Sequence, residues 1–363
     1  MTKIIPFNEP LDRNNKIQLV LKILSLTFQI LVLIIIAAGL LIYFIGFHNK
    51  PPAVEETEPC PNKYSGFVCD ECGVIHNEPN VKIAGGIAVS NNSWPAAAFI
   101  VFDYYNYLRL NNSWFYLARR FFCGATLINR RTIITAGHCI IDRLDFVFRN
   151  VPYSIRVEPN DYMTTVAEMY SVYINAQDLN GWNLWRLPPP LLKIGVVEFT
   201  RHEEYNPVTY LNNIAVFKLS YEVELDHNTQ LACLPDPSYD SYPLTLNVDG
   251  WITGWGENIT NGTFPILRNQ NAKVKIYDNS VCMASRNPFF RDGEKQLCAG
   301  STAADICSAD AGNALYVRDK VNGVDKFIMV GIASFGASCA SGPPSVFTKV
   351  SAYRDWILHH VSY

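Results

Sequence analysis

The sequence predicts an all-β domain that is preceded by one membrane-spanning helix and ends in a short helix. Residues 23–47 form a long apolar run without charge, and Ser351–Val361 places apolar residues at helical spacing. From Ile83 onward, short β-branched and aromatic runs alternate with turn residues, a pattern typical of strands. The predicted parts are a cytoplasmic tail (1–22), a transmembrane helix (23–47), an extracellular stem (48–82) and a folded domain (83–363).

The composition excludes one class of partner. The 363-residue chain carries 30 Lys and Arg against 33 Asp and Glu, a net charge of -3, and its basic residues form no block. A nucleic-acid-binding surface requires clustered positive charge. We therefore expect no nucleic-acid partner.

The apolar run at 23–47 predicts a membrane anchor. Its 25 residues, at about 1.5 Å each, cross a hydrocarbon layer of ~30 Å with some tilt. A cleaved signal peptide is the alternative, but the run exceeds the roughly 7 to 15 residues of a signal core and no small-residue cleavage site follows it. Four Lys or Arg residues precede the run and only Lys50 follows closely, which predicts a type II plasma-membrane protein with an extracellular C-terminal domain.

The cysteines and sequons agree with an extracellular domain. All ten cysteines follow the predicted span, an even number suited to disulfides in an oxidising compartment. Neither HExxH nor a paired CxxC motif is present, so we expect no metal and no cofactor. CDEC at Cys69–Cys72 is interpreted as structural. Candidate glycosylation sites begin at Asn91, Asn111, Asn258 and Asn261.

Individual elements follow in chain order. The stem contains Pro51–Pro52 and few apolar residues, so it predicts a linker and not a core. Thr132–Thr135 (TIIT) predicts a strand. The runs ALYVRDKV and VDKFIMVGI flank Asn322–Gly323, the dipeptide best suited to a two-residue turn, and predict a hairpin.

A series of ordered motifs then identifies a family. In sequence order they are IAGG (83–86), FCGATLIN (122–129), TAGHC (135–139), NNIAVFKL (212–219), ITGWG (252–256), CSADAGNAL (307–315), GIASFG (331–336) and PPSVFTKV (343–350). With these motifs the region from Ile83 to the end resembles the trypsin-like serine protease family. The resemblance implies two packed antiparallel six-stranded β-barrels that close with a helix.

The resemblance also implies disulfide pairings, which spacing alone leaves open. Cys72 is the best of the three stem cysteines to pair with Cys233, and Cys60 with Cys69 is what remains. The other implied pairs are Cys123 with Cys139, Cys282 with Cys298, and Cys307 with Cys339.

Two of the three catalytic positions implied by the resemblance carry the wrong chemistry. Acyl transfer requires a hydroxyl nucleophile, an imidazole base and a carboxylate that fixes the imidazole tautomer. His138 fills the imidazole position, whereas Asn213 stands for the carboxylate, a change that costs about 10⁴ in rate in an active triad. Ala311 stands for the nucleophile, and its methyl group cannot attack a carbonyl.

The oxyanion hole is altered as well. The family places a glycine where this chain has Ala309, whose N–H, with that of Ala311, would face the developing oxyanion. Ser308 is the nearest alternative hydroxyl, but we expect it at the mouth of the pocket, too far from His138 for direct proton transfer.

The residues that line the substrate-specificity pocket in the family are better preserved here than the catalytic residues. Asp305 matches the carboxylate at the base of the primary specificity pocket, which either still attracts Lys and Arg side chains or is an inert remnant. Gly336 keeps one pocket wall, Ser334 precedes it, and Ser345 replaces the glycine of the other wall, which narrows the slot.

The activation residues also remain. Lys82 offers a trypsin-type cleavage site before Ile83, and Asp310 matches the acid that pairs with the freed amino group. Either cleavage reorders a binding surface by an order–disorder switch, or these residues are vestigial.

The chain is long between His138 and Asn213, which are 75 positions apart. We expect the surplus near Pro159–Lys193, where aromatic residues either anchor a partner or pack on the barrel. Those aromatics are Tyr162, Tyr170, Tyr173, Trp182 and Trp185. The segment Phe102–Phe122 is also long and aromatic, and part of it is expected to face solvent.

These observations predict a catalytically inactive serine protease homologue that works by binding an extracellular protein. The expected partner is a protease, a protease substrate, or a matrix or cell-surface ligand, and one helix contacts the membrane. The alternatives are a membrane-tethered trypsin-like endopeptidase with residual or unconventional activity, and a passive glycosylated surface component.

Overall fold

The computed structural model divides the chain into two units, Met1–Pro59 and Cys60–Tyr363. The described residues of the first unit are helical, and most of the predicted span 23–47 lies outside them. In the part of the chain that is described, no helix combines the length and the apolar character needed to cross a membrane. The structure describes residues 21–22, 24–27, 29, 72–75, 87–88, 93–110, 113–159, 163–176, 191–236, 241–255, 269–285, 287–301, 310–321, 323–335 and 344–361.

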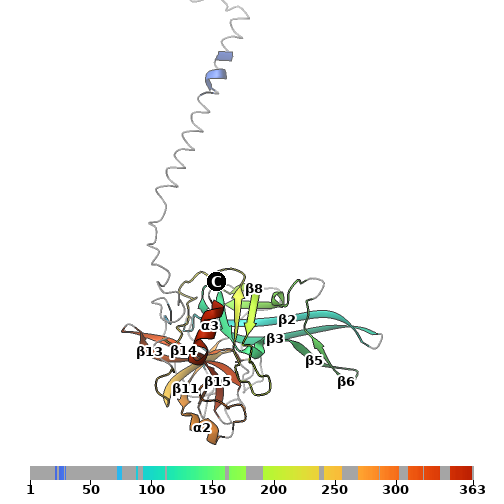
Figure 1. Cartoon of the computed structure of the whole chain (residues 1–363). Helices are drawn as coiled ribbons and strands as arrows, with labels where there is room; N and C mark the ends of the chain where they lie inside the picture. The colour runs from blue at the N-terminus through green and yellow to red at the C-terminus, as the bar shows by residue number, and fades with distance from the viewer. Residues whose placement is uncertain are drawn as a thin grey trace, which may run out of the picture. The chain divides into compact units, whose positions relative to one another are not determined.

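The first half of the folded unit is a closed antiparallel barrel of six strands (Figure 1). Its strand order is β2-β3-β4-β9-β8-β7, and β-branched and aromatic side chains fill its interior, as expected for strands with one buried face. The strands are β2 (Ala97–Leu110), β3 (Ser113–Asn129), β4 (Thr132–Thr135), β7 (Tyr170–Ile174), β8 (Leu192–Arg201) and β9 (Ala215–Leu219).

The second half is a seven-stranded sheet of order β1-β11-β10-β13-β14-β15-β12, in which β12 also pairs with β11. The predicted hairpin is confirmed: β13 and β14 pair from Ala314–Ile332 to Val321–Val324, and Gly323 has φ +80°. The strands are β1 (Ile87–Ala88), β10 (Val248–Gly254), β11 (Gln270–Tyr277), β12 (Gln296–Gly300), β13 (Ala314–Val321), β14 (Val324–Phe335) and β15 (Ser345–Lys349).

Short helices connect and close the domain. The predicted terminal helix is present but begins later than expected, because Val350–Tyr353 forms a 3₁₀ turn (η3) and α3 covers only Arg354–Val361. Ile357 of α3 is fully buried, in agreement with its apolar spacing. The remaining helical segments are η1 (Gly137–Cys139), η2 (Val166–Met169) and α2 (Asn279–Ala284).

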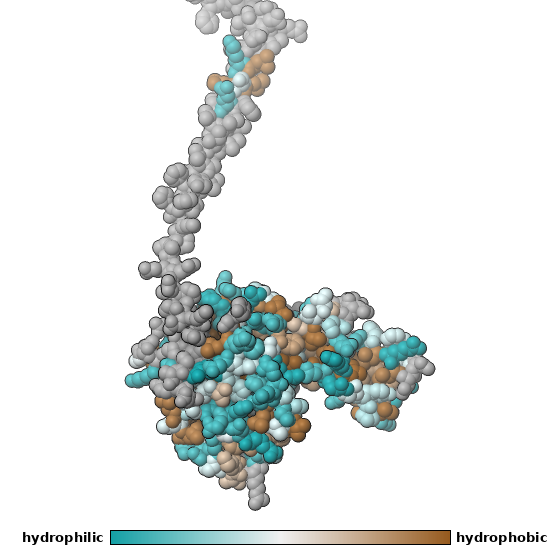
Figure 2. Space-filling model, in the orientation of Figure 1, coloured by the Kyte–Doolittle hydropathy of each residue, from teal (hydrophilic) through white to brown (hydrophobic). Residues whose placement is uncertain are grey.

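A long hairpin, β2–β3, projects from the barrel and carries a separate two-stranded sheet, β5 (Arg143–Phe148) and β6 (Val151–Arg156) (Figure 1). One face of the hairpin packs on this sheet, because the ring of Phe115 contacts those of Phe146 and Phe148. The other face is open: the exposed fractions of Tyr107 and Trp114 are 67% and 68%. Figure 2 shows hydrophobic and hydrophilic side chains side by side on this projecting part.

The extra length between His138 and Asn213 was expected near Pro159–Lys193, a range that lies partly outside the described residues. The described part of the connection includes the separate β5–β6 sheet at 143–156, between barrel strands β4 and β7. Tyr170 and Tyr173 of the predicted aromatic segment are buried in β7 and belong to the barrel core, so neither is available to a partner. Tyr162, Trp182 and Trp185 lie outside the described residues.

Candidate functional site

The predicted catalytic positions come from three connections between strands. His138 lies in η1, directly after β4, and Asn213 precedes β9 by two residues. Ala311 lies in the turn that leads into β13. Each position therefore follows or precedes a buried strand, which fixes its backbone while leaving its side chain in a loop.

Asn213 holds His138 through both ends of its amide. Asn213 is fully buried, and its Oδ1 accepts a hydrogen bond of 3.0 Å from the backbone N–H of His138. Its Nδ2 donates to Ser334 Oγ at 2.7 Å and lies 3.0 Å from His138 Nδ1. Because the backbone N–H needs an acceptor, the amide oxygen is fixed. His138 Nδ1 lies 3.2 Å from Oδ1 and 3.0 Å from Nδ2, so both amide atoms are within hydrogen-bond distance of the ring.

This arrangement fits both neutral tautomers of the imidazole. Nδ1–H would donate to Oδ1, whereas an unprotonated Nδ1 would accept from Nδ2 and leave the ring hydrogen on Nε2. Burial lowers the pKa of His138, an effect partly countered by the hydrogen bond with Asn213. His138 is thus neutral near pH 7.

Ala311 is held near this pair by backbone hydrogen bonds and one disulfide. The N–H of Gly124 donates to the Ala311 carbonyl at 2.8 Å, and the adjacent Cys123 is joined to Cys139, the neighbour of His138. On the other side, the N–H of Gly312 donates to the Ala333 carbonyl at 2.9 Å, next to Ser334. These hydrogen bonds and the disulfide therefore connect the segments that carry Ala311, His138 and Asn213 into one network.

Two glycines in or next to this network lie too close to neighbouring atoms to carry a side chain. Gly312 has φ +87°, and a Cβ there would lie 2.2 Å from both Gly124 O and Thr135 Oγ1. A Cβ on Gly254 would lie 2.0 Å from Asp310 Oδ1, so this carboxylate sits directly on the end of β10. The turn at 310–312 therefore packs closely against Gly124 and Thr135 of the barrel and against Gly254 of the second sheet.

Aromatic rings flank the imidazole. The ring of Tyr210 meets that of His138 edge-on at 5.6 Å between centroids. Tyr210 in turn contacts Phe289 and Phe335, whose centroids are 3.8 Å apart. Sequence reasoning did not single out these rings, because they come from three separate segments.

Asn313 was also missed. It is buried, and in the described part of the chain neither its Oδ1 nor its Nδ2 has a hydrogen-bond partner. Its amide packs on Gly124, where a Cβ would come within 2.0 Å of Asn313 Oδ1. The only sequence signal is a polar residue directly after Gly312, which gives no indication of burial.

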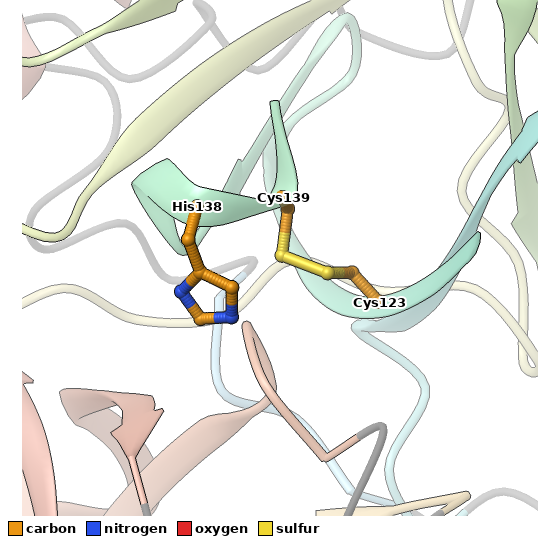
Figure 3. Close-up of side chains that lie close together, drawn as sticks. All are labelled: Cys123, His138 and Cys139. Atoms are coloured by element: carbon orange, nitrogen blue, oxygen red, sulfur yellow. A yellow bond between two sulfur atoms is a disulfide. The ribbon is translucent and has the colours of Figure 1, made fainter. Parts of the chain in front are cut away.

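The structure offers no metal site here. Ligand atoms of Cys123, His138 and Cys139 lie within 4.8 Å of one another, the one such group among the described residues. Figure 3 shows that the two cysteines are joined in a disulfide, which removes both thiolates as ligands.

Other predicted pairings and residues can be located as well. Disulfides join Cys72 to Cys233 and Cys282 to Cys298, as the resemblance implies. Ser345 is fully buried at the start of β15, and no hydrogen-bond partner of its Oγ is found in the described ranges. The predicted residues outside those ranges are Cys60, Cys69, Lys82, Ile83, Asn91, Asn111, Asn258, Asn261, Asp305, Cys307, Ala309, Gly336 and Cys339.

Comparison with known proteins identifies the family whose fold brings these segments together. The family model described as Trypsin matches residues 83–184 and 188–357. The chain belongs to the trypsin-like serine protease family. The match spans most of the domain, including all three predicted catalytic positions.

Three relatives from the trypsin-like family are each 27–30% identical to this chain. Proclotting enzyme from Tachypleus tridentatus is 27% identical over 88% of this chain and 76% of its own length. Transmembrane protease serine 11C from Mus musculus is 30% identical over 80% of this chain and 55% of its own. Chymotrypsin-C from Mus musculus is 30% identical over 80% of this chain and 93% of its own.

Proposed function

We propose that this member of the trypsin-like family is a catalytically inactive homologue that acts by binding an extracellular protein. The observation that carries the proposal is Ala311 at the nucleophile position, since its side chain offers no atom that can form an acyl-enzyme. Asn213 supports it, because an amide at the carboxylate position can hold the imidazole in the tautomer with its hydrogen on Nε2, which cannot accept a proton there.

Labelling with a fluorophosphonate tests this proposal. The probe is applied to the full-length protein before and after cleavage at Lys82–Ile83, and we expect no covalent adduct in either form. The doubly substituted Ala311→Ser, Asn213→Asp protein, handled identically, is the positive control. An adduct on the unsubstituted protein would establish the rival function, a membrane-tethered endopeptidase with an unforeseen nucleophile.

The scaffold around the site supports a binding role. The network that connects the segments of Gly124, Ala311 and Ser334 is complete: its backbone hydrogen bonds and its disulfide are formed although the side chain at position 311 cannot take part in catalysis. A disulfide-linked scaffold beneath a binding surface suits recognition, because less conformational entropy is lost on binding when the scaffold is already ordered. The partner we propose is a protease, a protease substrate, or a matrix or cell-surface ligand.

We further infer that the domain is a glycoprotein displayed outside the cell by a type II anchor at 23–47. The apolar run, the basic residues before it and the four sequons support this topology. One relative is named a transmembrane protease. Loss of mass on glycosidase treatment, together with surface biotinylation of the C-terminal domain on intact cells, tests it; an unglycosylated, intracellular protein would contradict it.

The activation residues and the pocket carboxylate are proposed as the switch and the contact for the partner. Lys82, Ile83 and Asp310 are retained although the nucleophile is not, which supports a cleavage that reorders a binding surface. Proximity labelling from the domain on intact cells, in Lys82→Gln and Asp305→Ala proteins, should lose a specific partner. Unchanged labelling in both variants would identify these residues as remnants.

We also infer that the second sheet closes into a barrel. β12 pairs with β15 along Gln296–Ala299 and with β11 along Cys298–Gly300. These pairings support a ring of six strands, β11-β10-β13-β14-β15-β12, with β1 attached at its edge. Uniform amide protection along β11 and β12 tests this inference, because an open sheet would leave one edge exchanging rapidly.

A further inference from the structure

A hollow of about 520 Å³ lies between the β5–β6 sheet and the barrel, within the size range of ligand sites. Its lining is mixed: the apolar part, here called the floor, includes Ile140, Val157, Val166 and Phe199, and charged side chains make up much of the rest. The hollow begins beside the catalytic position, since Ile140 directly follows η1.

Two arginines at the rim face each other without a carboxylate between them. Arg143 of β5 and Arg156 of β6 are direct cross-strand partners, and both line the hollow. Like charges in that position repel and destabilise a sheet. Arg143 Nε and Nη2 bond only the neutral Ser154 Oγ and carbonyl, at 3.0 and 3.2 Å, and Arg156 forms no ion pair with any described residue. A bound anion would relieve this repulsion.

A third arginine already has its counter-charge. Arg201 Nη2 lies 2.5 Å from Asp142 Oδ2, and its guanidinium also covers the ring of Tyr205. Asp142 pairs with Arg201 and, within the described residues, forms no ion pair with Arg143 or Arg156. The lining thus keeps an excess of two positive charges, both on the β5–β6 side.

Acidic residues near the hollow form no ion pair with Arg143 or Arg156 in the described part of the chain. Asp145 lies on the same face of β5 as Arg143, opposite Ser154 of β6. The carboxylate of Glu168 in η2 accepts hydrogen bonds from the N–H and the hydroxyl of Thr164. Glu158 follows Val157 and is exposed to solvent. Among the described residues, neither carboxylate forms an ion pair with a rim arginine.

We propose that this hollow binds an acidic peptide segment of a protein partner, with an Asp or Glu carboxylate between Arg143 and Arg156 and a neighbouring apolar side chain on the floor. Guanidinium groups bind carboxylates by paired, charge-assisted hydrogen bonds. The apolar floor distinguishes this occupant from a sulfated polysaccharide, which offers anions without apolar side chains to bury. The inference holds whether or not the domain is catalytically inactive, and its failure would leave the fluorophosphonate result unaffected.

Selection from a random hexapeptide mixture tests the proposal on the full-length protein. The retained peptides are sequenced by mass spectrometry, and their composition is compared with that of the input. We expect Asp and Glu to be enriched several-fold, next to an apolar residue. The most enriched peptide is then titrated by fluorescence anisotropy, and its affinity should fall at least tenfold in the Arg143→Gln, Arg156→Gln protein.

Three controls make the test decisive. The Arg119→Gln, Arg130→Gln protein loses the same charge from exposed positions outside the hollow and should bind the peptide within twofold of the unsubstituted protein. An Asn or Gln analogue of the peptide should bind at least tenfold more weakly. The proposal is overturned if acidic peptides are not enriched, if Arg143→Gln, Arg156→Gln leaves the affinity unchanged, or if a heparin hexasaccharide binds through the two arginines while peptides do not.

Discussion

The side-chain amide of Asn213 contacts both the backbone and the ring of His138. Its Oδ1 accepts the His138 N–H at 3.0 Å, and its Nδ2 lies 3.0 Å from Nδ1. Ser334 Oγ accepts the other Nδ2 hydrogen at 2.7 Å. A carboxylate at the same place would accept three hydrogen bonds, from the same N–H, from Nδ1–H and from the Ser334 hydroxyl, and would hold the ring hydrogen on Nδ1.

Restoring the nucleophile alone should therefore not restore chemistry. We expect Ala311→Ser protein to react with fluorophosphonate about 10⁴ times more slowly than Ala311→Ser, Asn213→Asp protein, because an amide in place of the triad carboxylate favours the wrong imidazole tautomer. Ala309→Gly, added to the double variant, should accelerate the reaction further by restoring the oxyanion hole. The measurement is the rate of adduct formation by mass spectrometry.

The control for this experiment is His138. Ala311→Ser, Asn213→Asp, His138→Ala protein should lose the gain, since the imidazole is the group that accepts the proton. If Ala311→Ser alone reacts as fast as the double variant, the Asn213 amide does not hold the imidazole in the wrong tautomer.

Burial of neutral His138 predicts how stability depends on pH. The folded-state pKa of His138 lies below the value of about 6.5 in an unfolded chain, so the unfolded chain binds more protons between the two values. The associated stability is fully present above about pH 6.5 and is lost as the pH falls. We expect the free energy of unfolding by urea to decrease from pH 7.5 to 5.5, with His138 contributing at most about 1.4 kcal/mol per pH unit.

Two substitutions separate His138 from other groups. In His138→Gln protein the decrease toward acid should be smaller than in the unsubstituted protein. In Asn213→Asp protein the new carboxylate should raise the pKa of His138, because it favours the imidazolium, and the His138 contribution should change sign. An identical pH dependence in all three proteins would contradict the assignment.

The sequence predicted some parts of this molecule well because their signals are local. Asn322–Gly323 predicts the β13–β14 turn, and Gly323 indeed has φ +80°. The β5–β6 sheet had a weaker signal: Leu144, Phe146 and Phe148 alternate as in a strand, but the turn at Arg149–Asn150 has positive φ at both residues without a glycine. Arginine is an uncommon residue at such a position, so the turn was not recognised.

The site shows a different limit. Its residues, His138, Asn213 and Ala311, were named from the sequence, and the structure places them on three linked connections. The direction of the Asn213 amide was not predictable, because it depends on the His138 N–H and on Ser334, 121 positions away. Long-range hydrogen-bond partners of this kind have no periodic pattern in a sequence.

The turn that carries Ala311 should tolerate no side chain at Gly312. We expect Gly312→Ala to destabilise the domain by at least about 2 kcal/mol, because it combines an unfavourable φ of +87° with overlap of Gly124 O and Thr135 Oγ1. Gly323→Ala is the matched control: φ is +80°, but nothing lies within 4 Å of its Cβ, so it should cost about 1 kcal/mol. Equal costs in urea unfolding would exclude the overlap as a cause.

The β5–β6 sheet should depend on one buried aromatic contact. Phe146 is 8% exposed and packs on Phe115 and Tyr153, so Phe146→Ala should cost about 3 kcal/mol of local stability and accelerate amide hydrogen exchange across β5 and β6. Val147→Ala, at a neighbouring position that is 69% exposed, should change stability by less than about 0.5 kcal/mol.

Because the same strands carry Arg143 and Arg156, Phe146→Ala should also weaken binding of an acidic peptide, whereas Val147→Ala should not. Unchanged exchange in Phe146→Ala protein would show that β5–β6 is held by something other than its contact with the β2–β3 hairpin.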